Sequence, residues 1–347
     1  MNHKRPIIID SFRYDDTNDY SSLVDSASGL LREVFDFLWD WYSNDEYILV
    51  STSGSTGEPK EIELSKEMMI ESAKATCEHF GLTTRSTLHL CLPVKYIAGK
   101  MMLVRAMVSG AKLILEEPSA TPFKTLNQRV DFAALTPMQV DGVLNSHHEK
   151  INYINQLIIG GGAVGLALSK KLQGLKTRCY STYGMTETAT HVAVKVLNGP
   201  VKSDLFCAVG RTGFTIDERS CLVVTSRHLG IKNLVTNDVV ELADNQAFRW
   251  LGRFDNVINT GGVKVFPERI EAKLANSMDR PYFVIGVQHQ SLGEEVVLIV
   301  EGNCDPPNFE HLDKYERPKR TISVDSFVYT PTNKIQRNLT LQKALNA

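Results

Sequence analysis

Apolar residues recur at helical spacing over residues 22–42, with charged residues falling mostly between them. The apolar set is Leu23, Leu30, Leu31, Val34, Phe35, Leu38 and Trp41. Spacings of three and four residues place such side chains on one face of a helix. The pattern predicts a single amphipathic helix that leads into an apolar strand end at 47–50.

Further along the chain, short apolar runs alternate with segments of helical spacing. We expect helices at 65–80 and 99–108, and strands at 87–92, 112–115, 132–135, 157–159 and 180–183. This alternation is typical of an α/β fold with a mainly parallel sheet covered on both faces. Between about 205 and 252, short strands with turn residues at 222–225, 238–242 and 248–251 predict a small antiparallel subdomain.

The length of 347 residues is enough for two domains. We place the boundary at Gly252, which is followed by Arg253, Phe254 and Asp255. The expected units are a large N-terminal α/β domain, residues 1–252, and a small, mobile α+β domain, residues 253–347.

Composition excludes several classes of protein. The formal net charge of −2 gives no support for a nucleic-acid or anionic-membrane partner. The six cysteines are scattered without close pairs, which favours a reduced, cytoplasmic setting over a zinc site or a disulfide framework. The N-terminal apolar run is too short for a signal peptide, and the apolar region 101–115 is interrupted by Arg105 and Lys112, so no membrane span is expected.

The stretch after the strand end at 47–50 carries the strongest chemical signal. Residues 51–60 are Ser51, Thr52, Ser53, Gly54, Ser55, Thr56, Gly57, Glu58, Pro59 and Lys60. Small residues let backbone N–H groups approach an anion, hydroxyls add donors, and the lysine adds positive charge. The stretch therefore predicts a polyphosphate-binding loop. It is not a Walker A loop, because no Gly-Lys-Ser/Thr follows at the required spacing. A flexible linker is the alternative.

Four further segments are each ambiguous alone. The glycines at 160–162 follow a strand and allow a flat ligand to approach the backbone, although a tight turn would also explain them. The segment 180–188 combines two tyrosines with Thr186 and Glu187; Glu187 suits Mg²⁺, and a helix-capping loop is the alternative. Asp238 could bind ribose hydroxyls or stabilise a turn. Lys334, in the segment 330–337, could be an ordinary surface lysine.

In this order and at these separations, the segments resemble the core motifs of the adenylate-forming superfamily. That superfamily comprises acyl-CoA synthetases, nonribosomal adenylation domains and beetle luciferases. Its phosphate loop, Ser/Thr-Ser-Gly-Ser/Thr-Thr-Gly-x-Pro-Lys, is matched by 52–60, and its Tyr-Gly-x-Thr-Glu by 183–187. Asn237 departs from the glycine usual before the ribose-binding aspartate. About fifty residues precede the loop here, where relatives carry over a hundred, which favours compact acid:CoA ligases.

The resemblance implies a role for each matching residue. Thr52, Ser53, Ser55, Thr56 and Lys60 would hold the β- and γ-phosphates of ATP. The adenine would lie against Gly161, Gly162, Ala163 and Tyr183, and the ribose against Asp238 and Arg253. Thr186 would contact the α-phosphate, Glu187 would bind Mg²⁺ and Lys334 would be the catalytic lysine. Asp255 would be the hinge of the C-terminal domain, and Gly261 and Gly262 would line the channel for the coenzyme A thiol.

The segment 92–99 resembles the superfamily's acyl-pocket motif. Lys95 and Tyr96 stand where an aromatic residue or histidine is usual. Within the superfamily, the resemblance is greatest to o-succinylbenzoate:CoA ligases of menaquinone biosynthesis, whose substrate is an aromatic keto-dicarboxylate. Candidates for its distal carboxylate are Lys95, Lys100, Arg105 and His191. On a helix, His191 would lie on the same side as Glu187, four residues earlier.

The sequence therefore favours an ATP-dependent acid:CoA ligase that acts on a small carboxylic acid. Two alternatives stay open. One is adenylation of an aryl or amino acid for a carrier protein, although no pocket aspartate for an α-ammonium group stands out. The other is a non-catalytic nucleotide-binding relative, which is disfavoured because Glu187 and Lys334 are both present.

Overall fold

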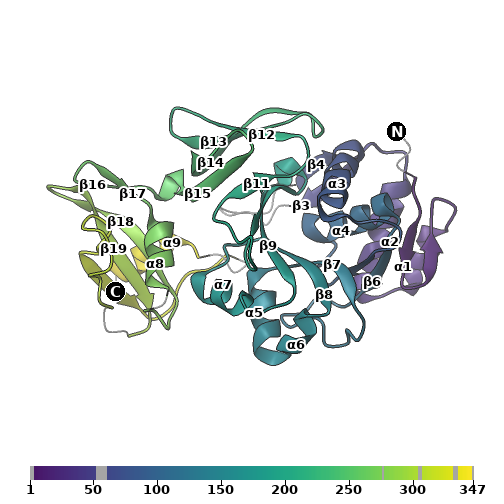
Figure 1. Cartoon of the computed structure of the whole chain (residues 1–347), viewed down its shortest axis with the longest axis horizontal. Coiled ribbons are helices and arrows are strands. Elements are labelled where there is room, and N and C mark those ends of the chain that lie inside the picture. The colour runs from purple at the N-terminus through teal and green to yellow at the C-terminus, as the bar shows by residue number, and fades with distance from the viewer. Residues whose placement is uncertain (1–3, 52–60, 276, 304–306, 331–334, 346–347) are drawn as a thin grey trace.

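The computed structural model describes residues 4–51, 61–275, 277–303, 307–330 and 335–345. A 13-stranded sheet forms its centre, in the order β12-β13-β14-β15-β11-β10-β9-β8-β7-β5-β6-β1-β2 (Figure 1). From β1 to β9 its strands are β1 (Ile7–Ile9), β2 (Phe12–Tyr14), β5 (Thr87–Leu90), β6 (Lys112–Leu115), β7 (Val130–Leu135), β8 (Ile154–Ile159) and β9 (Arg178–Gly184). The others are β10 (His191–Val196), β11 (Phe206–Ala208), β12 (Thr212–Ile216), β13 (Cys221–Ser226), β14 (Ile231–Leu242) and β15 (Ala247–Arg253).

The strands from β9 to β1 in this order are parallel and have helices on both faces. One face packs against α1 (Tyr20–Ser26), α2 (Gly29–Tyr42), α3 (Lys66–Phe80) and α4 (Ile97–Ser109). The other packs against α5 (Pro137–Ser146), α6 (His148–Ile151) and α7 (Leu166–Leu172). Alternate side chains of β7 serve the two cores, since Phe132 belongs to the first and Ala133 to the second. The expected two-sided α/β fold is confirmed.

The antiparallel strands expected between 205 and 252 do not form a detached sheet. Strands β10, β11 and β15 pair antiparallel in succession and join β12–β14 to the edge of β9. Phe206, Phe214 and Phe248 pack together in the core of this half. The parallel and antiparallel halves therefore share one continuous hydrogen-bonded ladder (Figure 1).

A second sheet lies beyond Arg253, at the left of Figure 1. Its strands are β16 (Ile258–Thr260), β17 (Val263–Val265), β18 (Tyr282–His289), β19 (Gly293–Glu301) and β20 (Arg320–Val324). The helices α8 (Pro267–Leu274) and α9 (Arg337–Leu345) pack in cores on this sheet. These elements give the α+β architecture expected for the C-terminal residues.

The prediction of a single helix over 22–42 is wrong. The segment forms α1 and α2, separated by Ala27 and Ser28 in extended conformation. Gly29 has a φ of +58°, and a Cβ there would collide with the Glu117 carboxylate. That carboxylate accepts a hydrogen bond of 2.8 Å from the Leu30 amide at the start of α2. A residue distant in sequence thus caps α2 and divides the amphipathic pattern.

Residues on either side of the expected phosphate loop form a hairpin. Strands β3 (Tyr47–Ser51) and β4 (Glu61–Ser65) pair antiparallel in a two-stranded sheet. The loop itself, 52–60, is outside the described residues. Ser65 ends β4 and caps α3, because its side chain accepts a hydrogen bond from the Met68 amide.

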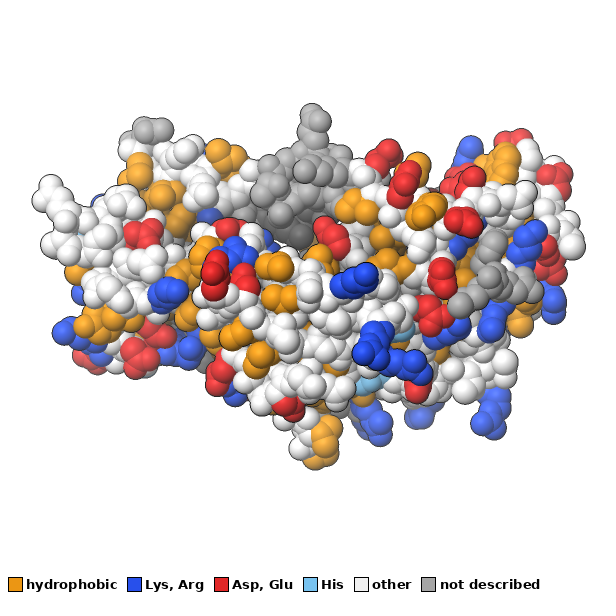
Figure 2. Space-filling model, turned by 90° about the horizontal axis from the view of Figure 1, so that it is seen from above, with side chains coloured by type: hydrophobic (Ala, Val, Ile, Leu, Met, Phe, Trp, Pro, Cys, Tyr) orange, Lys and Arg blue, Asp and Glu red, His pale blue; other side chains and the backbone are white. Residues whose placement is uncertain are grey.

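The face of the molecule drawn in Figure 2 carries no dominant charge. Figure 2 shows acidic and basic side chains spread over the same face, in keeping with the net charge of −2. Within the described ranges, no helix is both long enough and apolar enough to cross a bilayer.

Candidate active site

The glycines at 160–162 lie at the carboxyl ends of parallel strands. Gly160 directly follows β8, and its amide donates to the Leu135 carbonyl at the end of β7, at 3.0 Å. Gly161, Gly162 and Ala163 are exposed. Open α/β sheets bind ligands at this edge. The glycine segment therefore presents accessible backbone where a nucleotide is expected.

The segment 183–187 lies at the end of the neighbouring strand, β9. Gly184 must be glycine, because a Cβ would collide with the Thr190 carbonyl and the His191 backbone. Thr186 and Glu187 lie in a short 3₁₀ turn, Thr186–Thr188, and Glu187 is exposed. The helix considered for 187–191 is not formed, because strand β10 begins at His191.

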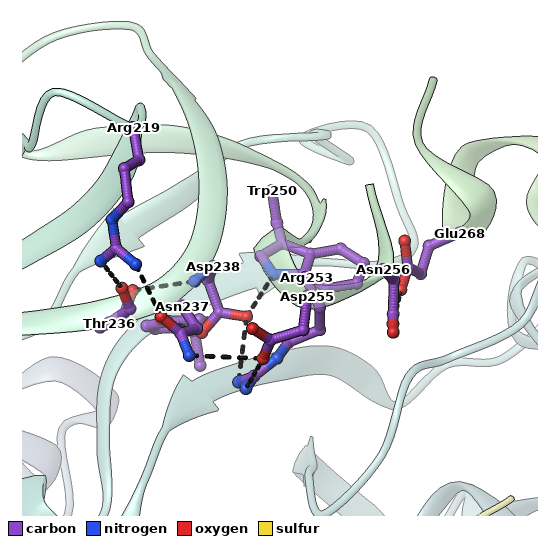
Figure 3. Close-up of polar contacts among 10 residues, drawn as sticks. Arg219, Thr236, Asn237, Asp238, Trp250, Arg253, Asp255, Asn256 and Glu268 are labelled. Carbon is purple, nitrogen blue, oxygen red and sulfur yellow. Dashed lines mark hydrogen bonds and ion pairs between the residues drawn. The ribbon is translucent and has the colours of Figure 1, made fainter. Parts of the chain in front are cut away.

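Asp238 on β14 is the most extensively bonded carboxylate of the site (Figure 3). It is 7% exposed. Its Oδ2 accepts from the Tyr183 hydroxyl at 2.7 Å, and its Oδ1 accepts from Trp250 Nε1 at 3.0 Å. Burial and the Asp238 charge both raise the pKa of Tyr183, so the phenol stays protonated and donates. Two of the predicted nucleotide-binding residues are thus in direct contact.

Arg253 and Asp255 extend this cluster toward the C-terminal sheet (Figure 3). Arg253 pairs with Asp238 in the β14–β15 register, and its Nη1 lies 3.8 Å from Oδ1 of that carboxylate. Arg253 Nη2 also donates to Asp255 Oδ2 at 3.4 Å. Asn237 Nδ2 donates to the same Asp255 oxygen at 3.3 Å. Asn237, the departure from the family motif, therefore connects β14 to the predicted hinge.

Other predicted residues are dispersed or lie outside the described ranges. Gly261 and Gly262 form the turn between β16 and β17, and the Gly261 amide donates to the Leu292 carbonyl at 2.9 Å. Thr52, Ser53, Ser55, Thr56, Lys60 and Lys334 are not described. A Cβ at Gly261 would lie nearest to Leu292 and Tyr315 of the C-terminal part, and one at Gly262 would meet no atom within 4 Å.

The candidate acid-pocket residues fall into two groups along α4. Tyr96 caps α4, and Lys95 is exposed, with its ammonium 5.1 Å from the centre of the Tyr96 ring. His191 lies instead beside Arg105. Arg105 follows Tyr96 by nine residues, which corresponds to about 13 Å along the axis of α4. Lys100 faces neither group, because its ammonium lies over the Phe37 ring of α2. The structure therefore brings together His191 and Arg105, and separates them from Lys95 and Tyr96.

Arg105 is buried without a carboxylate partner. It is 1% exposed, and among the described residues it forms no ion pair and its Nε has no hydrogen-bond partner. Its Nη2 donates to Thr190 Oγ1 at 2.9 Å, and its guanidinium lies 6.0 Å from the Phe132 ring centre. Burial lowers the pKa of Arg105 to about 10, so it stays cationic near neutrality. An uncompensated buried cation is costly, and an anionic ligand would relieve that cost.

The pKa of His191 lies well below 6.5. Burial is the largest cause, and the neighbouring Arg105 and His79 add to it. The ring is therefore neutral at physiological pH. Of these two residues, only Arg105 carries a positive charge, so only Arg105 would form an ion pair with an anionic ligand.

A further cavity lies between the antiparallel strands and the start of the C-terminal part. It has a volume of about 510 Å³ between the antiparallel strands and residues 254–266, and Val239, Leu251 and Phe266 help to line it. Because side chains alternate along a strand, Val239 faces away from Asp238. Arg219 also lines this cavity and donates to Asn237 Oδ1 at 3.2 Å, so the cavity borders the polar cluster on its Asn237 side.

Three residues of the site carried no recognisable sequence signal. Trp250 donates to Asp238 because β15 pairs with β14, which a strand pattern alone does not reveal. Glu33 on α2 accepts from the Val94 and Lys95 amides at 2.7 and 3.2 Å and so holds the acid-pocket segment. Thr190 contacts Arg105. Only the tertiary structure supplies these contacts.

The amino-acid sequence is similar to those of known enzymes. Residues 28–227 match the family model described as AMP-binding enzyme. The 2-succinylbenzoate–CoA ligase of Haemophilus influenzae is 26% identical over 277 residues, 73% of this chain and 58% of that protein. The chain thus spans less than two thirds of that relative.

Two solved structures cover more of the chain. An acyl-CoA synthetase (AMP-forming)/AMP-acid ligase II-like protein from Dyadobacter fermentans is 32% identical, with a TM-score of 0.63 over 93% of this chain and 98% of that one. The o-succinylbenzoate coenzyme A synthetase of Bacillus subtilis, in complex with ATP and magnesium ion, has a TM-score of 0.71 at 18% identity, over 94% of this chain and 82% of that one.

Proposed function

Because this chain belongs to the AMP-binding enzyme family, we propose that it uses ATP to join a carboxylic acid to AMP and then transfers the acyl group to coenzyme A. The observation that carries the proposal is the contact between Tyr183 and Asp238 beside the exposed glycines at the sheet edge. Adenine would lie against Gly161, Gly162, Ala163 and Tyr183. Asp238 and Arg253 would hold the ribose.

The first half-reaction requires positive charge around the α-phosphate. A carboxylate oxygen attacks the α-phosphorus, the bond to the bridging oxygen breaks, and pyrophosphate leaves. In this proposal the segment 52–60 holds the β- and γ-phosphates, Thr186 donates to the α-phosphate, and Lys334 stabilises the charge that develops there. One such preorganised donor contributes on the order of 10²–10³ in rate.

The residues present fit a magnesium ion that arrives with ATP. Among the described residues, no group of three or more His, Cys, Asp or Glu side chains could hold a metal. Mg²⁺ commonly takes one or two carboxylates and completes its shell with phosphates and water. The exposed Glu187 at the sheet edge offers one such carboxylate. When bound, the ion would neutralise phosphate charge.

The second half-reaction requires access for a thiol. The sulfur attacks the acyl carbon, and AMP leaves with the bonding electron pair. We propose that residues 253–347 form a domain that rotates about Asp255 between the two steps. The short connection 254–257 between β15 and β16 supports this, as does the turn position of Gly261 and Gly262, which would then line the thiol channel.

The acid that suits this site best has a second anionic group. Arg105 is a buried cation without an ion pair among the described residues, and a carboxylate of the substrate would supply the missing charge. The Haemophilus influenzae relative is named for 2-succinylbenzoate, an acid of this kind. We therefore propose 2-succinylbenzoate as the substrate, with Arg105 at its ring carboxylate and His191 next to Arg105. Lys95 and Tyr96 would lie nearer the entrance.

A cytoplasmic location accords with this activity. ATP and coenzyme A are cytoplasmic substrates. The structure describes five free cysteines, which accords with a reducing compartment: Cys77, Cys91, Cys179, Cys207 and Cys221.

The test is to incubate the protein with ATP, Mg²⁺, coenzyme A and 2-succinylbenzoate and to identify the products. We expect AMP, pyrophosphate and an acyl-CoA thioester. Release of ADP and phosphate would rule out the adenylate route. Pyrophosphate release with monocarboxylic acids but not with 2-succinylbenzoate would retain the chemistry and reject the substrate.

A further inference from the structure

A chain of hydrogen bonds runs from Arg105 on α4 through β10 to α3. Arg105 Nη2 donates to Thr190 Oγ1 at 2.9 Å, and that hydroxyl lies 3.4 Å from His191 Nδ1. The other ring nitrogen, His191 Nε2, lies 3.2 Å from Thr76 Oγ1. Thr76 Oγ1 in turn lies 3.1 Å from the Ser72 carbonyl oxygen. Every link joins buried or partly buried groups.

Donors and acceptors can be assigned along this hydrogen-bond chain in only one way. The Ser72 carbonyl can only accept, so the Thr76 hydroxyl proton points to it, and Thr76 must accept from His191 Nε2–H. His191 Nδ1 then carries no proton and accepts from the Thr190 hydroxyl. That hydroxyl keeps a lone pair for Arg105, which can only donate. The chain is satisfied only when His191 is neutral with its proton on Nε2.

Protonation of His191 would break the chain. A proton on Nδ1 would require Thr190 to accept from both His191 and Arg105, and the Thr190 hydroxyl proton would lose its acceptor. The groups that face the ring also disfavour a charge, since His191 is buried next to Arg105 from α4 and near His79 from α3. Geometry and electrostatics therefore select the same neutral ring.

The backbone around Thr190 and His191 departs from regular geometry. Ala189 is buried and has φ +58° and ψ −42°, and the Thr190 amide donates to the Thr188 carbonyl across it at 2.6 Å. This is a γ-turn, a rare conformation for a residue with a side chain. The β9–β10 register then shifts between His191 and Ala193. Such irregularities re-aim side chains and cluster at ligand sites.

We propose that Thr190 and His191 are positioning residues that fix the Arg105 guanidinium, so that its unpartnered Nε faces the second carboxylate of the substrate. The proposal rests on the proposed function, because it assigns the acid preference of that same site. The hydrogen-bond chain holds one Nη2 hydrogen of Arg105 and leaves the Nε–H for the ligand. The selectivity of the site for a dicarboxylic acid over a monocarboxylic one would then depend on residues that do not contact the acid.

Kinetics of Thr190→Val test the proposal, since valine matches threonine in shape and cannot accept from Arg105. We expect kcat/KM for 2-succinylbenzoate to fall at least about tenfold, as for loss of a charge-assisted hydrogen bond. For the analogue that lacks the ring carboxylate, we expect it to stay within about twofold. Thr190→Ser restores the hydroxyl and should restore selectivity. His79→Gln is the matched control, because His79 is near the ring but outside the chain.

Equal losses for both acids, or no loss for either, would overturn the proposal. A second measurement does not depend on the substrate. Nitrogen NMR of ¹⁵N-histidine-labelled protein should show His191 neutral with its proton on Nε2 near neutral pH, and Thr190→Val should shift its Nδ1 signal. A protonated ring or the opposite tautomer would reject the chain, even if the wild-type protein activates a different acid and the proposed substrate fails.

Discussion

The hydroxyl of Tyr183 donates to the Asp238 carboxylate at 2.7 Å, although 55 residues separate the two in sequence. Trp250 donates to the other carboxylate oxygen, so Asp238 is oriented from both sides before any ligand binds. A carboxylate has further lone pairs, and ribose hydroxyls could donate to them. Preorganisation of this kind reduces the entropy lost when a ligand binds.

Asp238→Asn should weaken ATP binding while the fold is retained. The amide oxygen can still accept from Trp250, but the charge and one acceptor are lost. Charge-assisted hydrogen bonds contribute about 1.5–3 kcal/mol, so we expect the KM for ATP to rise about tenfold or more. Pyrophosphate release at varied ATP concentration measures this. Glu241→Gln, in the same strand, removes an exposed carboxylate paired with Arg249 and should leave KM unchanged. An unchanged KM in Asp238→Asn would remove Asp238 from the nucleotide site.

Lys334→Ala should separate the two half-reactions. We expect adenylation to fall by about 10²–10³, because a positive charge near the α-phosphate is lost. Thioester formation from supplied acyl-adenylate should persist, because that step does not require the lysine. Lys314→Ala removes an exposed lysine of the same C-terminal part, which lies over Tyr315, and serves as control. Equal loss of both half-reactions would contradict the role given to Lys334.

Gly262→Leu should have the opposite effect. Gly262 has a φ of +80° in the β16–β17 turn, and a Cβ there would meet no atom within 4 Å. A leucine side chain would therefore extend into open space, where the thiol is expected to pass, and adenylation should survive while thioester formation is blocked. Gly230→Leu imposes a similar backbone cost, since Gly230 has a φ of +70° and also nothing within 4 Å. If Gly230→Leu reduces thioester formation equally, backbone strain explains the effect and no channel is needed.

Stability should fall as the pH drops below about 6.5, partly because of His191. Its pKa lies well below 6.5 in the folded state, mainly through burial. The unfolded chain therefore takes up a proton that the folded chain does not, and the free energy of unfolding decreases by up to about 1.4 kcal/mol per pH unit. Urea unfolding at several pH values between 7 and 5 measures this slope. His79 and His228 also have lowered pKa values and add to it.

His191→Gln isolates the contribution of one residue to that slope. Glutamine cannot take up a proton, so the stability of the wild type should fall relative to that of the variant as the pH falls. A constant difference over this range would mean that folding does not change the pKa of His191.

Local pattern predicted much of the fold. The expected strand at 112–115 and the helix at 65–80 agree closely with β6 and α3, because β6 is a distinct apolar run and α3 has a clear apolar period and a capping serine. The break between α1 and α2 could not be predicted, since it depends on the Glu117 carboxylate, which reaches the Leu30 amide from a distant segment. The pairing of β10 with β11, which joins the two halves of the sheet, likewise depends on long-range pairing.

The candidate site shows the same division. Motif resemblance selected Tyr183 and Asp238, which the structure places in contact. The sequence offers Arg105 as one of several candidate cations, and only its burial without a carboxylate distinguishes it from Lys95 and Lys100. Thr190 could not be predicted from the sequence, because a threonine carries no signal until its neighbours in space are known.

The shared ladder of the 13-stranded sheet has a mechanical consequence. The strands that present Tyr183, Asp238 and Arg253 are joined by continuous backbone hydrogen bonds, so they can shift relative to one another only at the cost of those bonds. Any large reorientation during turnover must then be absorbed after Arg253, in the four residues before β16. In the proposed mechanism, the nucleotide would bind to a rigid sheet, and the short connection between β15 and β16 would accommodate the rotation of the C-terminal residues.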